Sequence, residues 1–142
     1  MRKLLITAAA GAGLLMTTVA ANAATPAGTY THSQGAYTLC VTNNVVDSGA
    51  TQMIQVDLGG LPKQPGSLTS PIGWNASSSS VAGLWTISWT TMGSGLNNGV
   101  QLCGFGFKDH GRQITAILPL TITEMTPSGT FFETLTSTAT RI

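Results

Sequence analysis

Residues 85–90 have the sequence WTISWT, in which every second side chain is large and apolar and the others are Thr or Ser. A period of two places all the apolar side chains on one face of a β-strand. The segments 37–42 (YTLCVT) and 54–58 (IQVDL) show the same alternation, with Ile54, Val56 and Leu58 expected on one face. No stretch of eleven or more residues has apolar positions at helical spacing. The sequence therefore predicts an all-β protein.

Three further strands are expected at 103–107, 114–123 and 131–142, separated by turns rich in Gly, Pro and Asn, whereas the serines at 77–80 are expected in a loop. In the segment 103–107 (CGFGF), Cys103, Phe105 and Phe107 are expected on one face, and the intervening glycines indicate the close approach of another group. Pro119 indicates an edge strand or a bulge. Together these features predict a single-domain antiparallel β-sandwich, Ig-like or jelly-roll-like, with a small barrel as the alternative.

Residues 1–23 have the features of a secretory signal peptide. Arg2 and Lys3 precede an apolar stretch, and residues 21–23 (ANA) provide the small-x-small pattern that signal peptidase accepts. The apolar stretch is too short for a membrane span and contains glycines. We therefore expect cleavage to leave the domain 24–142, which is secreted to a periplasmic, cell-surface or extracellular location without membrane insertion.

Cys40 and Cys103 are the two cysteines, and both remain after cleavage. In an exported chain, a pair of cysteines predicts a disulfide. The wide separation favours a bridge between two facing sheets, with a bridge inside one sheet and an intermolecular bridge as the alternatives.

The remaining charges exclude several classes of partner and of chemistry. Residues 24–142 carry four basic and five acidic side chains, a net charge of −1, which attracts neither nucleic acid nor an anionic membrane. His32 and His110 have no second His or Cys at metal-ligand spacing, so no metal site is expected. The segment 108–112 (KDHGR) is typical of a solvated hairpin turn, with a polar recognition loop as the alternative. No catalytic motif is present, and we expect neither enzymatic activity nor a cofactor.

Trp74, Trp85 and Trp89 are the strongest candidates for a ligand site. A row of exposed aromatic rings on a strand can stack on sugar rings, which would make the protein a carbohydrate-binding module. Ile87 between two of the tryptophans favours the alternative, in which this face belongs to the core.

The surface composition is the most informative property of the sequence. Residues 24–142 contain 19 Thr, 12 Ser, 5 Asn and 6 Gln but only nine charged side chains, and charges at strand edges normally stop sheets from pairing. Thr134, Thr136, Thr138 and Thr140 form an uncharged row that we expect at an assembly edge. The sequence thus predicts a secreted, non-enzymatic structural or adhesive protein of the cell surface or extracellular matrix, of the kind found in biofilms, which self-associates. The alternative is a carbohydrate-binding module with a neutral polysaccharide as its partner.

Overall fold

The computed structural model describes residues 27–44, 52–109, 117–125 and 132–142. Within these residues the chain forms strands and no helix, which confirms the predicted all-β class. The strands are β1 (Ala27–Ser33), β2 (Ala36–Thr42), β3 (Gln52–Leu61), β4 (Gly66–Thr69), β5 (Trp74–Val81), β6 (Leu84–Thr91), β7 (Gln101–Lys108), β8 (Ile117–Met125) and β9 (Phe132–Arg141). The described part of the chain has no helix that is long and apolar enough to cross a membrane. The predicted signal peptide at 1–23 lies outside the described residues.

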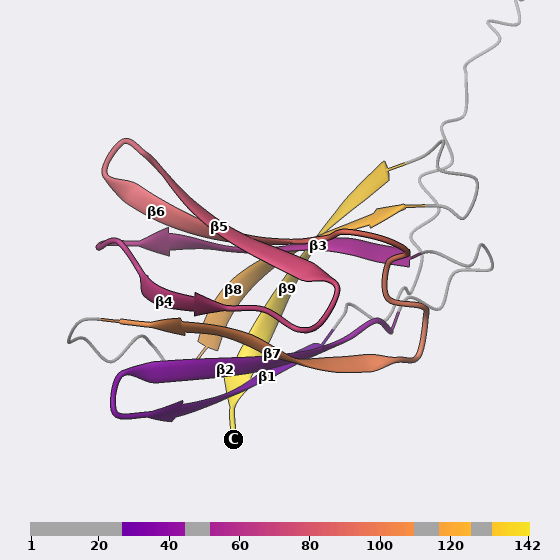
Figure 1. The fold of residues 1–142 in the computed structure, drawn as a ribbon, viewed down its shortest axis with the longest axis horizontal. Coiled ribbons are helices and arrows are strands. Elements are labelled where there is room, and N and C mark those ends of the chain that lie inside the picture. Colours follow the sequence, from indigo (N-terminus) through magenta and orange to yellow (C-terminus); the bar gives the residue numbers. More distant parts are fainter. Residues whose placement is uncertain (1–26, 45–51, 110–116, 126–131) are drawn as a thin grey trace, which may run out of the picture.

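The strands form one curled sheet in the order β4-β7-β2-β1-β9-β8-β3-β6-β5. In Figure 1, β7, β2 and β1 lie in one layer and β3, β6 and β5 lie in the other, while β8 and β9 run diagonally from one layer to the other. All neighbouring strands are antiparallel except β1 and β9, which are parallel. The end strands β4 and β5 are not hydrogen-bonded to each other, so the fold is an open β-sandwich, as predicted.

The core lies between the two layers and is filled from alternate strand positions. Leu39 and Val41 of β2 are fully buried in one layer. Ile87 and Trp89 of β6 are fully buried in the other. The ring of Phe105 meets that of Trp89 edge-on, with ring centroids 5.8 Å apart. The period of two in YTLCVT and WTISWT therefore predicted the inward faces of β2 and β6 correctly.

A β-bulge interrupts the alternation in β3. Its pairing with β8 shifts between Met53 and Gln55, so that Ile54 is the extra residue. Met53 and Val56 are fully buried, whereas Ile54 is only half-buried. The expectation that Ile54 shares the inward face of Val56 was wrong, because one extra residue reverses the direction of the side chains that precede it.

A second bulge, in β7, separates Cys103 from the aromatic residues that follow it. Leu39 pairs with Phe105 and Cys40 pairs with Cys103, which leaves Gly104 as the extra residue with a φ of 107°. Phe105 is buried and Cys103 is exposed. The expectation that they share a face was wrong, and the bulge at the glycine is the reason.

The predicted disulfide between Cys40 and Cys103 is confirmed. The two cysteines are directly paired residues of the neighbouring strands β2 and β7. The favoured interpretation, in which the bridge pins two facing sheets, was wrong, since the bridge lies on the outer side of one part of the sheet. The bulge at Gly104 causes this position, because it turns Cys103 to the same side as Cys40.

Two further expectations about strands are corrected. The serines at 77–80 lie in β5 and not in a loop. The strand that contains Pro119 is β8, which is an interior strand between β9 and β3 and not an edge. The ladder between β3 and β8 ends at the pair of Leu58 and Leu120, so Pro119 lies one residue beyond it. That position is compatible with the missing N–H of proline.

Candidate functional site

The three tryptophans do not form a common exposed platform. Trp89 is 0 % exposed and its Nε1–H donates to the carbonyl oxygen of Thr69 at 2.8 Å. Trp74 is 7 % exposed, and its ring meets Phe105 edge-on at 5.2 Å. Trp85 is half-buried and packs against the same core. The strand face that could have stacked on sugars is instead turned inward, as Ile87 between the two β6 tryptophans indicated.

The threonine row of the C-terminal strand is exposed, but its strand lies inside the sheet order of the described residues. Thr134, Thr136, Thr138 and Thr140 are all exposed. Their strand, β9, is an interior strand that pairs with β8 along its whole length. On its other side it pairs with β1, from Thr138 to Arg141 within the described residues. Thr138 and Thr140 are therefore paired on both sides, and for them the assignment to an assembly edge was wrong, whereas Thr134 and Thr136 pair with β8 alone within the described residues.

In the part of the chain that the structure describes, the sheet ends at β4 and β5, and β4 is a poor template for another strand. It has four residues, and its pairing with β7 is irregular between Gly66 and Thr69. Ser67 in its middle has a φ of 46°, which lies outside the β region. A short and irregular edge of this kind resists further pairing.

The other edge, β5, is long and regular. Its eight residues, Trp74–Val81, pair one to one with β6 without a register shift. The strand contains no charged residue and no proline, which are the usual protections of an edge. Side chains from Ser77 to Val81 are exposed or half-exposed. No described strand pairs with β5 on its other side, and we expect this side to accept a further strand.

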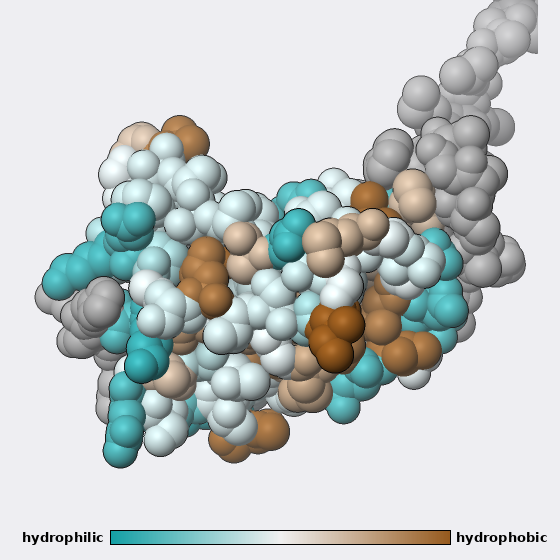
Figure 2. All heavy atoms as spheres, viewed as in Figure 1, coloured by the Kyte–Doolittle hydropathy of each residue, from teal (hydrophilic) through white to brown (hydrophobic). Residues whose placement is uncertain are grey.

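The hairpin that joins β5 to β6 carries an apolar tip. Ala82 and Gly83 form a two-residue turn with φ values of 51° and 81°, which is the geometry of a type I′ turn. Val81 and Leu84 on either side of it are 79 % and 53 % exposed. In Figure 1 the hairpin extends beyond the rest of the sheet, and in Figure 2 a brown patch lies at its end.

The outer face of the layer that contains β3, β6 and β5 is covered by polar side chains in register, of which all but Asp57 are uncharged. Two rows cross the strands β9, β8, β3, β6 and β5, and we call them together the outer polar face. One row is Thr136, Thr121, Asp57, Ser88 and Ser77, and the other is Thr134, Thr123, Gln55, Thr90 and Asn75. Neighbouring members of a row are separated by the interstrand spacing of about 4.8 Å.

One formal charge lies on the outer polar face, and it already has a partner. Nε2 of Gln55 donates to both carboxylate oxygens of Asp57, at 3.0 and 2.8 Å. The hydroxyls of Thr121, Thr136 and Ser88 form no hydrogen bond with another described residue. These groups are therefore available to water or to a ligand.

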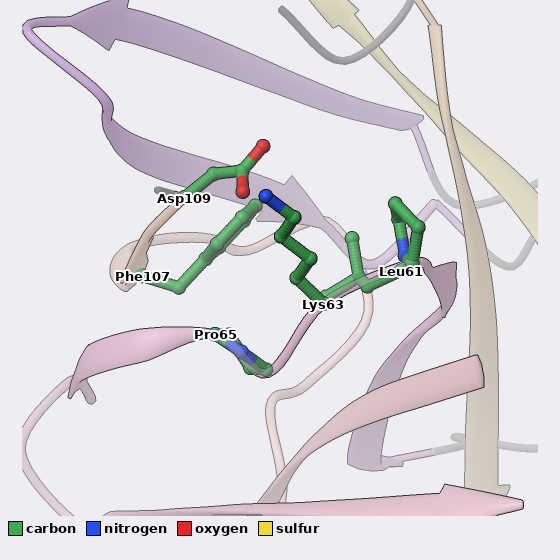
Figure 3. A pocket seen from close by; sticks show the side chains of 6 residues that line it. Leu61, Lys63, Pro65, Phe107 and Asp109 are labelled. Atoms are coloured by element: carbon green, nitrogen blue, oxygen red, sulfur yellow. The ribbon is translucent and has the colours of Figure 1, made fainter. Parts of the chain in front are cut away.

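A shallow hollow lies between the segment that joins β3 to β4 and the end of β7. It is lined by Leu61, Pro62, Lys63, Pro65, Phe107 and Asp109. Figure 3 shows the Lys63 side chain pointing toward Asp109, with the Phe107 ring beside it. The hollow is open to solvent and has room for about one water molecule. This is small beside the roughly 300–1,000 Å³ of typical ligand sites.

The charged and metal-ligating side chains do not gather into a site within the described residues. No group of three His, Cys, Asp or Glu side chains is close enough to hold a metal ion there. Glu124 is 1 % exposed and belongs to the interior, which the sequence pattern did not indicate. His32 stacks on Tyr37 with ring centroids 4.3 Å apart. His110 and the rest of the segment 110–112 lie outside the described residues.

No protein-family model and no curated protein matches this sequence. Among solved structures, the chain is similar to an uncharacterized protein from Nocardia farcinica with an immunoglobulin-like fold, with a TM-score of 0.49 and 14% identity over 76% of this chain and 82% of that one. It is also similar to a cohesin module from the family 33 glycoside hydrolase of Clostridium perfringens ATCC13124, with a TM-score of 0.43 and 9% identity over 83% of this chain and 98% of that one. At such identities the likeness concerns the fold alone.

Proposed function

We propose that this protein is a secreted, non-enzymatic structural or adhesive component outside the cell, which self-associates through an open edge of its sheet. The observation that carries the proposal is the free side of β5, eight residues long and without charge or proline. An edge of this kind presents a row of backbone donors and acceptors to any strand that can approach it. The disulfide between Cys40 and Cys103 supports an oxidising compartment as the place of action.

The side chains described above favour a structural role over a catalytic one. Of the carboxylates, Glu124 is buried and Asp57 is bound by Gln55. An enzyme needs acids, bases or nucleophiles that converge on a cavity. The hollow beside Phe107 is too small for that arrangement, and its two charged side chains lie at its rim.

Sedimentation velocity over a range of protein concentrations tests the proposal. We expect the unmodified protein to associate in moderate salt, and the double variant Ser77→Lys, Ser79→Lys to shift to monomer, because lysines on an edge strand oppose pairing. The matched control is Thr138→Lys, Thr140→Lys, which adds the same charge at exposed positions of β9 that are paired on both sides. This control should leave association unchanged. An unmodified protein that stays monomeric at the highest concentration would refute self-association.

A second candidate function is adhesion to a neutral polysaccharide, and the outer polar face favours it. Nucleic acid and anionic lipid bind basic side chains, and the core of a protein interface is apolar and rich in aromatic residues. The outer polar face has neither property, since its side chains are hydroxyls and amides with one paired carboxylate. Such a surface is complementary to a polymer that is itself uncharged and covered with hydroxyl groups.

Retention on an insoluble neutral glycan tests this second function. Replacing the cross-strand pair Thr123 and Thr134 by valine removes two hydroxyls with little change of shape, and we expect weaker retention. The control replaces Thr31 and Thr38, a cross-strand pair of β1 and β2 in the other layer. Equal retention of both variants and the unmodified protein would contradict binding by the outer polar face.

A further inference from the structure

We propose that β5 pairs with β5 of a second copy of this chain, antiparallel and around a two-fold axis at Ser78, so that association at this edge gives a closed dimer. This inference rests on the self-association proposed above and names its site and geometry. It follows from three features of the edge: which backbone groups are free, what the opposite edge of the sheet can accept, and which side chains would meet.

The turn geometry identifies the free backbone groups. In a hairpin with a two-residue loop, the residues that flank the loop form a hydrogen-bonded pair, and hydrogen-bonded pairs then alternate along the ladder. The flanking residues are Val81 and Leu84. The backbone groups of Val81, Ser79 and Ser77 therefore bond to β6. The N–H and C=O groups of Ala76, Ser78 and Ser80 point to the free side.

The hydrogen bonds near the start of β5 agree with this alternation. The N–H of Trp74 donates to the carbonyl oxygen of Pro71 at 3.1 Å, and so it is directed away from β6. The carbonyl oxygen of Gly73 accepts from the N–H of Met92 at 2.8 Å, and so it is directed toward the β6 side. Even-numbered residues of β5 thus belong to the free side.

The other edge of the sheet decides between a closed dimer and an open chain of molecules. A head-to-tail contact of β5 with β4 of the next copy would repeat without end and give a filament. β4 is four residues long, with irregular pairing and a positive φ at Ser67. It therefore lacks a regular row of backbone N–H and C=O groups to which another strand could bond. Of the two terminal strands only β5 is a suitable partner for β5, and a pairing of a strand with its own copy closes on itself.

The side chains permit the pairing around Ser78. On the axis, Ser78 meets Ser78 of the second copy as a hydrogen-bonded pair, and Ala76 meets Ser80 of the second copy on each side. On the outer side, Ser77 lies opposite Ser79 of the second copy. All of these side chains are small and uncharged, so neither steric overlap nor like-charge repulsion opposes the contact.

Cysteine cross-linking tests the register directly. Residues in a hydrogen-bonded antiparallel pair have Cα atoms about 5.5 Å apart, which is within the range of a disulfide. The variant Ser78→Cys should therefore oxidise to a covalent dimer, detected by mass spectrometry without reductant. The matched control Ser79→Cys should stay monomeric, because two copies of residue 79 would be diagonal neighbours about 7–8 Å apart.

Proline substitution gives a second, independent test. Ser78→Pro removes an N–H that faces the free side, so the β5–β6 ladder should survive while the dimer is lost, with at least a tenfold increase of the dissociation constant by sedimentation. Ser79→Pro removes an N–H that bonds to β6, and it should weaken the fold itself. Circular dichroism and thermal unfolding of both variants separate the two effects.

The outcomes distinguish this inference from the proposed function. Cross-linking of Ser78→Cys but not of Ser79→Cys supports the two-fold pairing. An unmodified protein that associates while Ser78→Cys fails to cross-link and Ser78→Pro still associates would overturn the inference and leave self-association standing. Filaments in place of dimers would also overturn it. A monomeric unmodified protein would overturn the proposed function as well.

Discussion

Two tryptophans on one strand are buried to different degrees, and this difference leads to a quantitative prediction about stability. Trp85 and Trp89 are four residues apart on the same face of β6, and the sequence pattern does not distinguish them. Trp89 is fully buried and donates to the carbonyl oxygen of Thr69, whereas Trp85 is half-buried. We predict that Trp89→Ala destabilises the protein more than Trp85→Ala.

The magnitudes follow from burial. Truncation of a fully buried aromatic residue costs about 3–5 kcal/mol through lost transfer free energy and the cavity that remains. Removal of the donor to Thr69 adds about 1 kcal/mol. Trp85 is partly exposed, so its truncation removes less buried surface and leaves a gap that water can enter, and we expect a loss at the lower end of that range, about 3 kcal/mol. The two free energies of unfolding should therefore differ by about 1 kcal/mol or more.

Urea unfolding followed by far-ultraviolet circular dichroism measures the difference without using the fluorescence that the substitutions change. The slope of the free energy of unfolding against urea concentration should be the same for both variants, so that their midpoints can be compared. A neutral glycan should retain both variants to the same extent as the unmodified protein, since neither ring is on the outer polar face. Equal losses of stability, or a larger loss for Trp85→Ala, would refute the assignment of Trp89 to the core and Trp85 to its margin.

Two further predictions concern β7. Unfolded, unreduced protein should show no free thiol, and replacing both Cys40 and Cys103 by serine should cost about 4 kcal/mol, since the bridge spans a sequence separation of 63 residues; two reactive thiols in the unreduced protein would contradict the bridge. Gly106→Ala should destabilise the fold by about 1–3 kcal/mol, because the new Cβ would overlap the Thr69 hydroxyl, and adding Thr69→Ala should restore part of the loss. If the second substitution restores nothing, the hydroxyl of Thr69 is not the obstacle.

The strands that the sequence predicted are those with two different faces. In β2 and β6 one face is buried and the other is lined by Thr and Ser, so the period of two is visible in YTLCVT and WTISWT. An edge strand at the margin of the core lacks this contrast. In β5 the residues from Ser77 to Ser80 are exposed or half-exposed on both faces, so no alternation marks the strand. Gly83 directly before the alternating segment is a weak turn signal, because Ala82 is not a residue that type I′ turns favour.

The pairing partners of a strand could not be predicted from its own residues. The bulge at Ile54 depends on how β3 pairs with β8, and nothing in the segment 54–58 marks it. The bulge at Gly104 left a trace, because a φ of 107° requires glycine, but the two glycines of CGFGF are equivalent in the sequence. The exposure of Thr136 was predictable from alternation, whereas the position of β9 inside the sheet follows from contacts with β1 and β8 that are distant in sequence.

The geometry connects the proposed dimer to the proposed adhesion. Both rows of the outer polar face end at β5, in Ser77 and Asn75, and the two-fold pairing would bring Ser79 of the second copy opposite Ser77. The two outer polar faces would then form one continuous surface across the axis. A single hydrogen bond to a solvated polymer contributes only about 0.5–1.5 kcal/mol, so a surface of this kind depends on the number of contacts. Two joined faces would bind one polymer at two places, which raises the overall affinity above that of a single face. If both proposals hold, the monomeric variant Ser78→Pro should be retained by a neutral glycan more weakly than the unmodified protein, although its outer polar face is intact.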